Sequence, residues 1–155
     1  MSAQIHLATP EDAERLLSMV YRFHQELGLD LSDEHRARAI MPLLEGNPLG
    51  AIYLIGPRRA PVGYICVCFG WAIELGGIDG FIDEFWVRPS VRGRGIGMEA
   101  LHKVLAALGQ AGVRFMHLEV DRENDKAQRL YSRAGFQPRE RYFLMSKELG
   151  NTPKA

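Results

Sequence analysis

The feature that most constrains this chain is a glycine-rich turn at Arg92–Gly97, which lies between a strand pattern and a helix pattern. Phe81–Val87 is apolar and strand-like, whereas Met98–Leu105 has the apolar spacing of a helix. Unpaired N–H groups and the positive end of the helix dipole converge at a helix N-terminus, and glycines let the backbone approach an anion closely. The sequence therefore predicts that residues 92 to 98 hold the phosphate groups of a cofactor.

Two common phosphate-binding patterns do not fit this turn. A dinucleotide fingerprint reads Gly-x-Gly-x-x-Gly, and here the third glycine, Gly97, comes one residue early. The acid expected about 20 residues later is also misplaced, because that position falls within the next strand pattern. The Gly-Lys-Ser/Thr of a P-loop is absent. The turn would therefore also bind phosphate through glycines and a helix N-terminus, but its glycine spacing differs from both patterns.

Composition narrows the class of protein. The chain has 155 residues, with 46% hydrophobic residues and 19 basic residues balanced by 19 acidic ones. This predicts one domain over residues 1–150 with a short disordered tail, 151–155. The neutral balance gives no reason to expect nucleic acid as a partner. No apolar run reaches the roughly 18 to 20 residues of a membrane span, and the N-terminus lacks a signal-peptide pattern, so a cytoplasmic protein is expected.

Neither the cysteines nor the histidines predict a metal centre. Cys66 and Cys68 lie two apart in an apolar segment, which places them on one face of a strand as packing residues. No further Cys or His clusters beside them, and the five histidines are scattered along the sequence. We therefore expect no metal.

Hydrophobic periodicity predicts a mixed order of strands and helices in one α+β domain. Three middle strands read as an antiparallel meander, and a β-α-β unit surrounds the glycine turn. Pro42 is expected to kink or split the second helix. The predicted elements are a strand at 4–8, a helix starting at Thr9, a helix starting at Ser32, strands at 51–55, 62–71 and 81–87, a helix to about 108, a strand at 113–120, a helix at 124–134 and one or two short strands after Phe136.

With these residues laid out, the chain resembles the GNAT superfamily of acetyl-CoA-dependent N-acetyltransferases. The Arg-x-x-Gly-x-Gly spacing of residues 92–97 matches that family's pyrophosphate loop. The Asn-x-x-Ala-x-x-x-Tyr-x-x-x-Gly-Phe spacing of residues 124–136 is similar to its second motif, and Asp83–Val87 to its fourth strand. The resemblance implies a mixed α/β fold with a central, mostly antiparallel, twisted sheet of six to seven strands and about four helices. The fourth and fifth strands should splay apart.

The resemblance also implies how acetyl-CoA is held. Backbone amides of residues 93 to 98 would bind the pyrophosphate, and the two loop arginines would pair with phosphates. Backbone groups of residues 85 to 87 would bind the pantetheine arm, with an amide near Val87 facing the thioester oxygen. Asn124 would either contact the arm or cap the following helix. The cofactor-binding residues implied are Phe85, Trp86, Val87, Arg92, Gly93, Arg94, Gly95, Ile96, Gly97, Met98, Asn124 and Tyr131.

Acid and base roles follow from the same resemblance. Tyr131 matches the general acid that protonates the departing thiolate. Three acids are candidates for the base that deprotonates the amine. Glu119 matches the base position of ribosomal-protein N-terminal acetyltransferases and is favoured, Asp83 aligns with the acid of polyamine-type enzymes, and Glu84 is the third candidate. Alternation along a strand puts Glu84 on the face opposite Asp83 unless a bulge turns it.

The expected activity is transfer of an acetyl group from acetyl-CoA to a primary amine. The amine would attack directly in a ternary complex, because no cysteine or serine stands in a recognisable nucleophile–base pair. The alternative is a non-catalytic acyl-CoA-binding sensor or regulatory domain. The acceptor is a small molecule or a peptide; aminoglycosides, polyamines, amino acids and protein N-termini all remain open. No membrane partner is expected, and a homodimer is left open.

Overall fold

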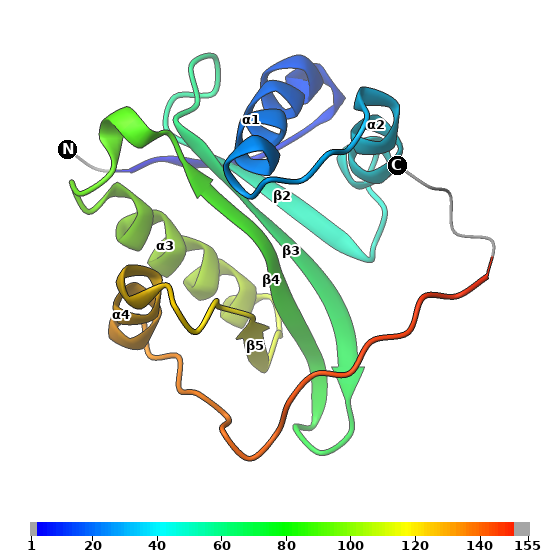
Figure 1. Cartoon of the computed structure of the whole chain (residues 1–155), viewed down its shortest axis with the longest axis vertical. Helices are drawn as coiled ribbons and strands as arrows, with labels where there is room; N and C mark the ends of the chain where they lie inside the picture. The colour runs from blue at the N-terminus through cyan, green and yellow to red at the C-terminus, as the bar shows by residue number, and fades with distance from the viewer. Residues whose placement is uncertain (1–2, 151–155) are drawn as a thin grey trace.

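The computed structural model describes residues 3–150 and shows one five-stranded sheet covered by helices on both faces (Figure 1). The strands lie in sequence order, and neighbouring strands are antiparallel except β4 and β5, which are parallel. The elements are β1 (Ile5–Leu7), the short 3-10 turn η1 (Pro10–Asp12), α1 (Ala13–Glu26), α2 (Asp33–Leu44), β2 (Gly50–Ile55), β3 (Gly63–Ala72), β4 (Gly77–Val87), η2 (Pro89–Val91), α3 (Ile96–Gln110), β5 (Phe115–Leu118) and α4 (Asp125–Arg133).

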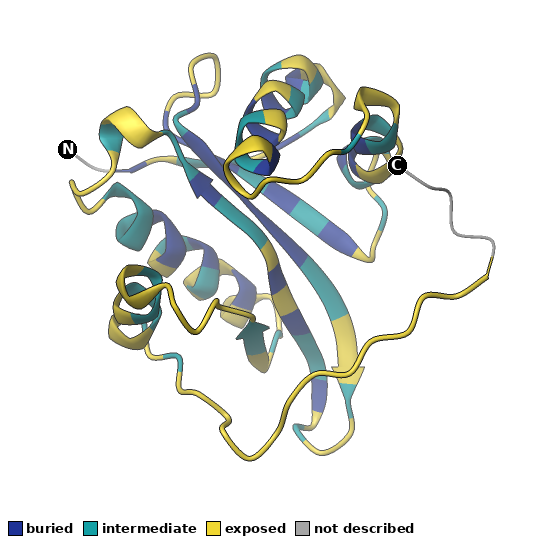
Figure 2. Ribbon diagram, in the orientation of Figure 1, coloured by how far each residue is buried: buried dark blue, intermediate teal, exposed yellow. Residues whose placement is uncertain are grey.

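The sheet separates two apolar cores, because side chains alternate along its strands. On β3, Tyr64 and Cys66 face the layer of α1 and α2, whereas Ile65 and Val67 face the layer of α3 and α4. All four are buried. Figure 2 shows that burial is concentrated along the middle of the sheet and the helix sides that face it. β3 is thus apolar throughout this stretch, as a strand covered on both faces must be.

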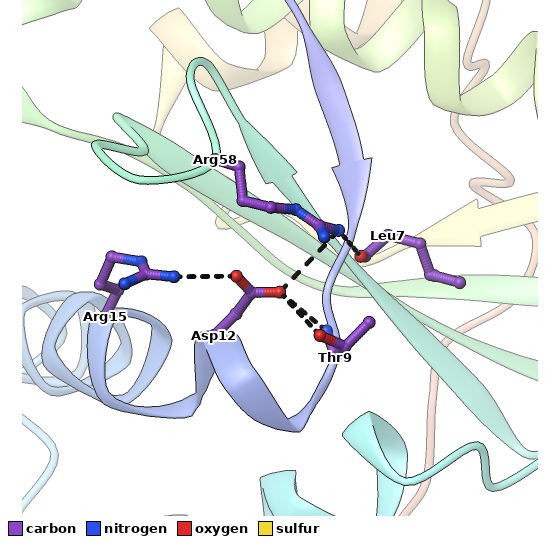
Figure 3. A network of polar contacts seen from close by, with 5 residues as sticks. All are labelled: Leu7, Thr9, Asp12, Arg15 and Arg58. Atoms are coloured by element: carbon purple, nitrogen blue, oxygen red, sulfur yellow. Dashed lines mark hydrogen bonds and ion pairs between the residues drawn. The ribbon is translucent and has the colours of Figure 1, made fainter.

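A buried carboxylate fixes the start of α1 (Figure 3). Asp12 accepts hydrogen bonds from the Thr9 N–H at 2.9 Å and from Arg15 at 3.1 Å, and it lies 3.9 Å from Arg58 of the β2–β3 loop. Arg58 also donates to the carbonyl of Leu7. Burial raises the pKa of Asp12, but these hydrogen bonds and the Arg58 charge outweigh burial and leave that pKa below its ordinary value. One carboxylate therefore joins β1, α1 and a distant loop.

β4 carries the irregularity that positions the site. In its pairing with β3, Glu84 lies opposite Cys66 and Ile82 lies opposite Val67, so Asp83 is an extra residue in a β-bulge. The parallel pairing with β5 ends at the same point, at Ile82 opposite Leu118. Residues 83–87 of β4 therefore have no strand beside them on the β5 side in the described chain. The predicted splay of the fourth and fifth strands is confirmed.

The number of strands differs from the prediction of six to seven. The described chain forms five, because the alternating residues after Phe136 join no neighbouring strand. β5 is also shorter than predicted, since β4 diverges from it after four paired residues. The tail expected to be disordered, 151–155, lies outside the described residues.

Two local predictions also change. Pro42 lies in the last turn of α2 and does not split the helix. The strand predicted to begin at Phe81 begins four residues earlier, because β4 starts at Gly77. A Cβ on Gly80 would lie 2.7 Å from the Met116 sulfur, so this glycine allows close strand packing rather than a turn. None of the helices formed by residues 3–150 has the length and apolarity to cross a membrane.

Candidate active site

The predicted phosphate loop leads into α3 through a left-handed glycine. Gly95 is the residue before α3 and has φ +79°, a conformation that other residues adopt only with strain. The first intrahelical bond of α3 runs from the Glu99 N–H to the Gly95 carbonyl. Within the described chain, the N–H groups of residues 93–98 donate no hydrogen bond to another residue. This cluster of unpaired donors at a helix N-terminus fits an anionic group.

Gly97 packs the loop against the end of β4. A Cβ at this position would lie 3.3 Å from the Phe85 ring and 3.5 Å from the Val87 side chain. A bulky residue at Gly97 would therefore press first on Phe85, whereas nothing described lies within 4 Å of a Cβ on Gly95.

The two loop arginines have different surroundings. Arg92 donates to both carboxylate oxygens of Glu26, at 3.0 and 2.9 Å, and its Nε donates to the carbonyl of Val87. Glu26 also accepts from the Trp86 indole at 3.0 Å. Burial raises the pKa of Glu26, but the hydrogen bonds from Trp86 and Arg92 outweigh it and lower that pKa overall. Arg92 thus ties the loop to α1, and Arg94, which is exposed, is the arginine available to a phosphate.

The side chains of β4 beyond the bulge diverge to the two faces of the sheet. Phe85 and Val87 pack in the core beneath α3, whereas Trp86 is buried in the core beneath α1 and α2. The backbone of these three residues is open toward β5, because strand pairing stops at Ile82. An extended ligand can bind this backbone as an added strand would.

Tyr131 projects from α4 toward β4. Its ring lies 6.4 Å from that of Phe85 and 6.0 Å from that of Phe136, measured between ring centroids. Burial raises the pKa of Tyr131 above its ordinary value. The phenol therefore keeps its proton near neutral pH, as a proton donor must.

The bulge brings two carboxylates to one face of β4. Glu84 accepts a hydrogen bond from the Tyr64 hydroxyl at 2.8 Å, and its other oxygen lies 2.6 Å from Nε2 of His24 on α1. Burial raises the pKa of Asp83, the neighbouring Glu84 charge raises it further, and His24 partly opposes the rise. Both carboxylates also help to raise the pKa of Cys66, after burial. Asp83 and Glu84 thus share the α1 face, and the alternation expected for a regular strand does not hold here.

Glu119 and Asn124 lie beyond the end of β5. Glu119 is exposed, and its charge is close enough to contribute to the raised pKa of Asp83. Asn124 accepts a hydrogen bond from the Ala127 N–H at 3.0 Å and caps α4. Of its two predicted roles, the structure shows the cap. Among residues 3–150, no group of three or more His, Cys, Asp or Glu side chains is placed to hold a metal ion.

Sequence reasoning missed His24, Tyr64 and Glu26. His24 is buried on α1, and its Nδ1 has no hydrogen-bond partner within residues 3–150. Each of the three contacts β4 only through folding, across 20 to 60 residues. For His24 and Glu26, the sequence offers one indication of a role, which is their position in the last turns of α1 beside the apolar stripe.

Comparison with known proteins shows the family to which the chain belongs. The sequence pattern of the Acetyltransferase (GNAT) family matches residues 13–136, so the chain belongs to the GNAT acetyltransferase family. An uncharacterized N-acetyltransferase of Mycobacterium bovis is 33% identical over 93 residues, which cover 56% of this chain and 58% of that protein. The chain therefore matches little more than half the length of that curated relative.

Solved structures share the fold over nearly the whole chain. An integron cassette protein from a salt-marsh metagenome is 35% identical, with a TM-score of 0.83, over 96% of this chain and 92% of that one. A predicted acetyltransferase of Clostridium acetobutylicum, solved with acetyl-CoA, is 17% identical, with a TM-score of 0.76, over 93% and 96% of the two chains. The second likeness concerns the fold alone.

Proposed function

We propose that this protein transfers an acetyl group from acetyl-CoA to a primary amine of a small molecule or peptide. One observation carries the proposal: the unpaired N–H groups of residues 93–98 lie beside a stretch of β4 that has lost its β5 neighbour. Such a site suits a ligand with a pyrophosphate at one end and an extended, amide-bearing arm at the other. The likeness to a fold solved with acetyl-CoA supports the choice of ligand.

Each part of the site has a task in this reaction. Acetyl-CoA supplies an activated acetyl thioester when it is bound. The N–H groups of residues 93–98 hold its pyrophosphate, and the backbone of Phe85–Val87 aligns its arm. Tyr131 holds a proton at its hydroxyl, because burial raises its pKa, and gives it to the departing sulfur.

The acceptor amine must lose a proton before it can attack. An amine with a pKa near 10.4 is only about 0.04% neutral at pH 7. Asp83, Glu84 and Glu119 interact electrostatically at the point where β4 and β5 separate. We assign the role of base to Asp83, since burial and the neighbouring Glu84 charge raise the pKa of its carboxyl group and so increase its affinity for a proton. The preference for Glu119 drawn from sequence stays a prediction.

Turnover tests the proposal directly. The protein is mixed with acetyl-CoA and a panel of amines that includes a polyamine, an aminoglycoside, free amino acids and a short peptide. Release of free thiol together with a mass increase of one amine by an acetyl group is the expected result. The same mixture without protein provides the control for uncatalysed transfer. Binding of CoA without acetylation of any amine would instead favour an acyl-CoA sensor.

A further inference from the structure

The helix layer of α1 and α2 covers only part of the sheet face on which Asp83 and Glu84 lie. The core on this face is built from α1, α2 and side chains of β2, β3 and the end of β4, and within residues 3–150 no side chain of β5 belongs to it. Figure 1 shows α1 and α2 beside β2, at a distance from β5. In the described chain, the first half of β4 and the neighbouring β5 therefore lack a helix layer on this face.

Three aromatic side chains, which we call the aromatic platform, gather on this open part of the sheet. Phe81 of β4 pairs with His117 of β5, and their ring centroids are 5.3 Å apart. His117 also stacks with Phe115 at 5.9 Å, with 26° between the ring planes. Alternation along β5 places these rings on the face opposite Met116 and Leu118, which pack beneath α3. Phe81 is 40% exposed and Phe115 is 51% exposed, so the platform presents apolar rings that a ligand can cover.

A carboxylate holds the centre of the platform in place. Oδ2 of Asp79 lies 3.3 Å from Nε2 of His117, and each of these two side chains is only 19% exposed. Because one ring nitrogen is held, the imidazole keeps its orientation between the two phenylalanines. A flat ligand can bind such a preformed surface without first having to order it.

The platform lies next to two of the three candidate bases. Asp83 follows Phe81 by two residues, and Glu119 follows His117 by two residues, so both acids continue the same face. The charge of Glu119 acts on Asp83, which shows that the two acids are near each other. A two-residue step along a strand is about 6.5–7 Å. A ring on the platform would therefore bring an amine to either acid through a chain of about two or three carbon atoms.

The charge of this face favours a cation. Asp79, Asp83 and Glu119 are spaced along it, and His117 is in contact with the first of them. A positively charged ligand would be attracted to these carboxylates, whereas a ligand with a carboxylate of its own would be repelled. The exposed rings add to this preference, because the face of an aromatic ring attracts a cation.

We propose that the acceptor is a small primary amine joined to an aromatic ring by a short alkyl chain, and that its ring rests on the aromatic platform. This choice of acceptor rests on the proposed acetyl transfer. The ring would cover Phe81 and Phe115, and the chain would direct the amine toward the point where β4 and β5 separate. An amine that carries a carboxylate, or that has no ring, fits this face less well.

The first experiment compares four acceptors by their kcat/KM for acetylation. Phenethylamine is tested against phenylalanine, which adds a carboxylate, against diaminobutane, which has no ring, and against cyclohexylethylamine, whose ring is not flat. We expect phenethylamine to exceed phenylalanine and diaminobutane by about tenfold or more. It should exceed cyclohexylethylamine by about three- to tenfold, the value of an aromatic contact beyond its area. Equal or better use of phenylalanine, of diaminobutane or of a short peptide would overturn the proposed acceptor.

The second experiment measures binding without turnover. Calorimetry with CoA-saturated protein gives the Kd for phenethylamine, and Phe81→Leu and Phe115→Leu should each raise it by about three- to tenfold, because leucine keeps an apolar side chain but not the ring. The matched control is Trp71→Leu, at a 71% exposed ring that alternation places on the opposite face of the sheet with Phe69. This control should bind phenethylamine as the parent does. An unchanged Kd in both phenylalanine variants, with circular dichroism showing intact folds, would overturn the platform.

The two experiments together distinguish failure of the acceptor proposal from failure of the proposed transfer. If phenethylamine binds through Phe81 and Phe115 but no amine is acetylated, the platform is supported and the proposed transfer is contradicted. If other amines are acetylated while phenethylamine is neither bound nor acetylated, the transfer is supported and the ring-bearing acceptor is contradicted.

Discussion

Nε2 of His24 lies 2.6 Å from Oε2 of Glu84, although 60 residues separate the two along the chain. The other oxygen of Glu84 accepts the hydroxyl of Tyr64, which is buried in the sheet. The carboxylate beside the β4 bulge is therefore held from α1 and from β3 at once. A group fixed on two sides is pre-organised, which is what a binding site for a charged acceptor requires.

The Tyr64 contact can be measured as stability. Tyr64→Phe keeps the ring but removes the donor to Glu84, so we expect the free energy of unfolding to fall by about 1.5–3 kcal/mol. Tyr53→Phe is the control, because the Tyr53 hydroxyl has no hydrogen-bond partner within residues 3–150. It should change stability by less than about 0.5 kcal/mol. Equal losses in urea denaturation of the two variants would show that the Tyr64 hydroxyl contributes no special stability.

Asp83→Asn should raise stability and lower activity. The folded-state pKa of Asp83 is raised, so its contribution to stability is full below the unfolded pKa near 3.9 and is lost as pH rises through the folded value. The variant should therefore melt at a higher temperature than the parent at pH 7, and the difference should vanish in acid. Turnover should fall by about 10²-fold or more at pH 7 and recover partly at high pH, where more amine is neutral.

Glu84→Gln and Glu119→Gln are the comparison variants for the base. If Asp83 is the base, both should keep the acidic limb of the pH–rate profile, and only Asp83→Asn should lose it. Loss of that limb in Glu119→Gln, with the limb intact in Asp83→Asn, would assign the base to the end of β5 instead.

Tyr131→Phe should act on the rate and leave binding nearly unchanged. The ring contacts with Phe85 and Phe136 are kept, and only the proton donor is removed. We expect kcat to fall by about 10²- to 10⁴-fold, with the Kd for CoA within about twofold of the parent. Single-turnover kinetics and calorimetry measure the two quantities separately. A parent-like kcat would mean that the tyrosine only packs.

Gly95→Ala should weaken CoA binding and cost stability. Its φ of +79° is unfavourable for alanine by about 1–2 kcal/mol, and relaxing the strain would turn the loop N–H groups away from the anion. Gly109→Ala lies in the same helix with open space around the new methyl group. It should stabilise the protein by about 0.5–1 kcal/mol without affecting CoA binding. If calorimetry gave the same CoA affinity for both variants, this loop would not be the phosphate site.

Asp12→Asn should show the opposite pH dependence to Asp83→Asn. The pKa of Asp12 is lowered on folding, so its stabilising effect is present above the unfolded pKa near 3.9 and is lost as pH falls through the folded value. The variant should be less stable than the parent by about 2–3 kcal/mol at pH 7, since it loses charge-assisted bonds. Chemical denaturation below pH 3 should show a much smaller difference. If the difference in the free energy of unfolding stayed constant across pH, the variant would be destabilised by altered packing and not by the lost charge of Asp12.

Local signals sufficed for much of the fold. The helix start at Thr9, the cap at Ser32, the meander of β2 to β4 and the turn into α3 are each encoded by adjacent residues, and all were predicted. The start of β4 was predicted too late, because glycine is common both in turns and in closely packed strands. Only the position of Met116 distinguishes these two uses at Gly80. The strands predicted after Phe136 do not form in the described chain, because alternation of apolar residues does not by itself supply a neighbouring strand.

The site was predictable where it depends on backbone and less so where it depends on distant side chains. The loop, the splay beside Phe85–Val87 and Tyr131 all follow from motifs. The contact between Arg92 and Glu26 and the contact between Glu84 and His24 both depend on how α1 lies against β4. That arrangement is set by packing of the whole core, so no local pattern contains it.

The two free cysteines have a practical consequence for chemistry at the bench. Burial raises the pKa of Cys66 and, to a lesser degree, that of Cys68, and the Asp83 charge adds to both effects. Only the thiolate reacts with disulfide reagents, so the buried Cys66 should stay largely inert at neutral pH, and Cys68 should react more slowly than an ordinary cysteine. A colorimetric thiol reagent added to the native protein should therefore report the sulfur released during turnover above a low background from the protein itself. The same two residues should become reactive on unfolding, which makes thiol labelling a sensitive measure of the unfolded fraction.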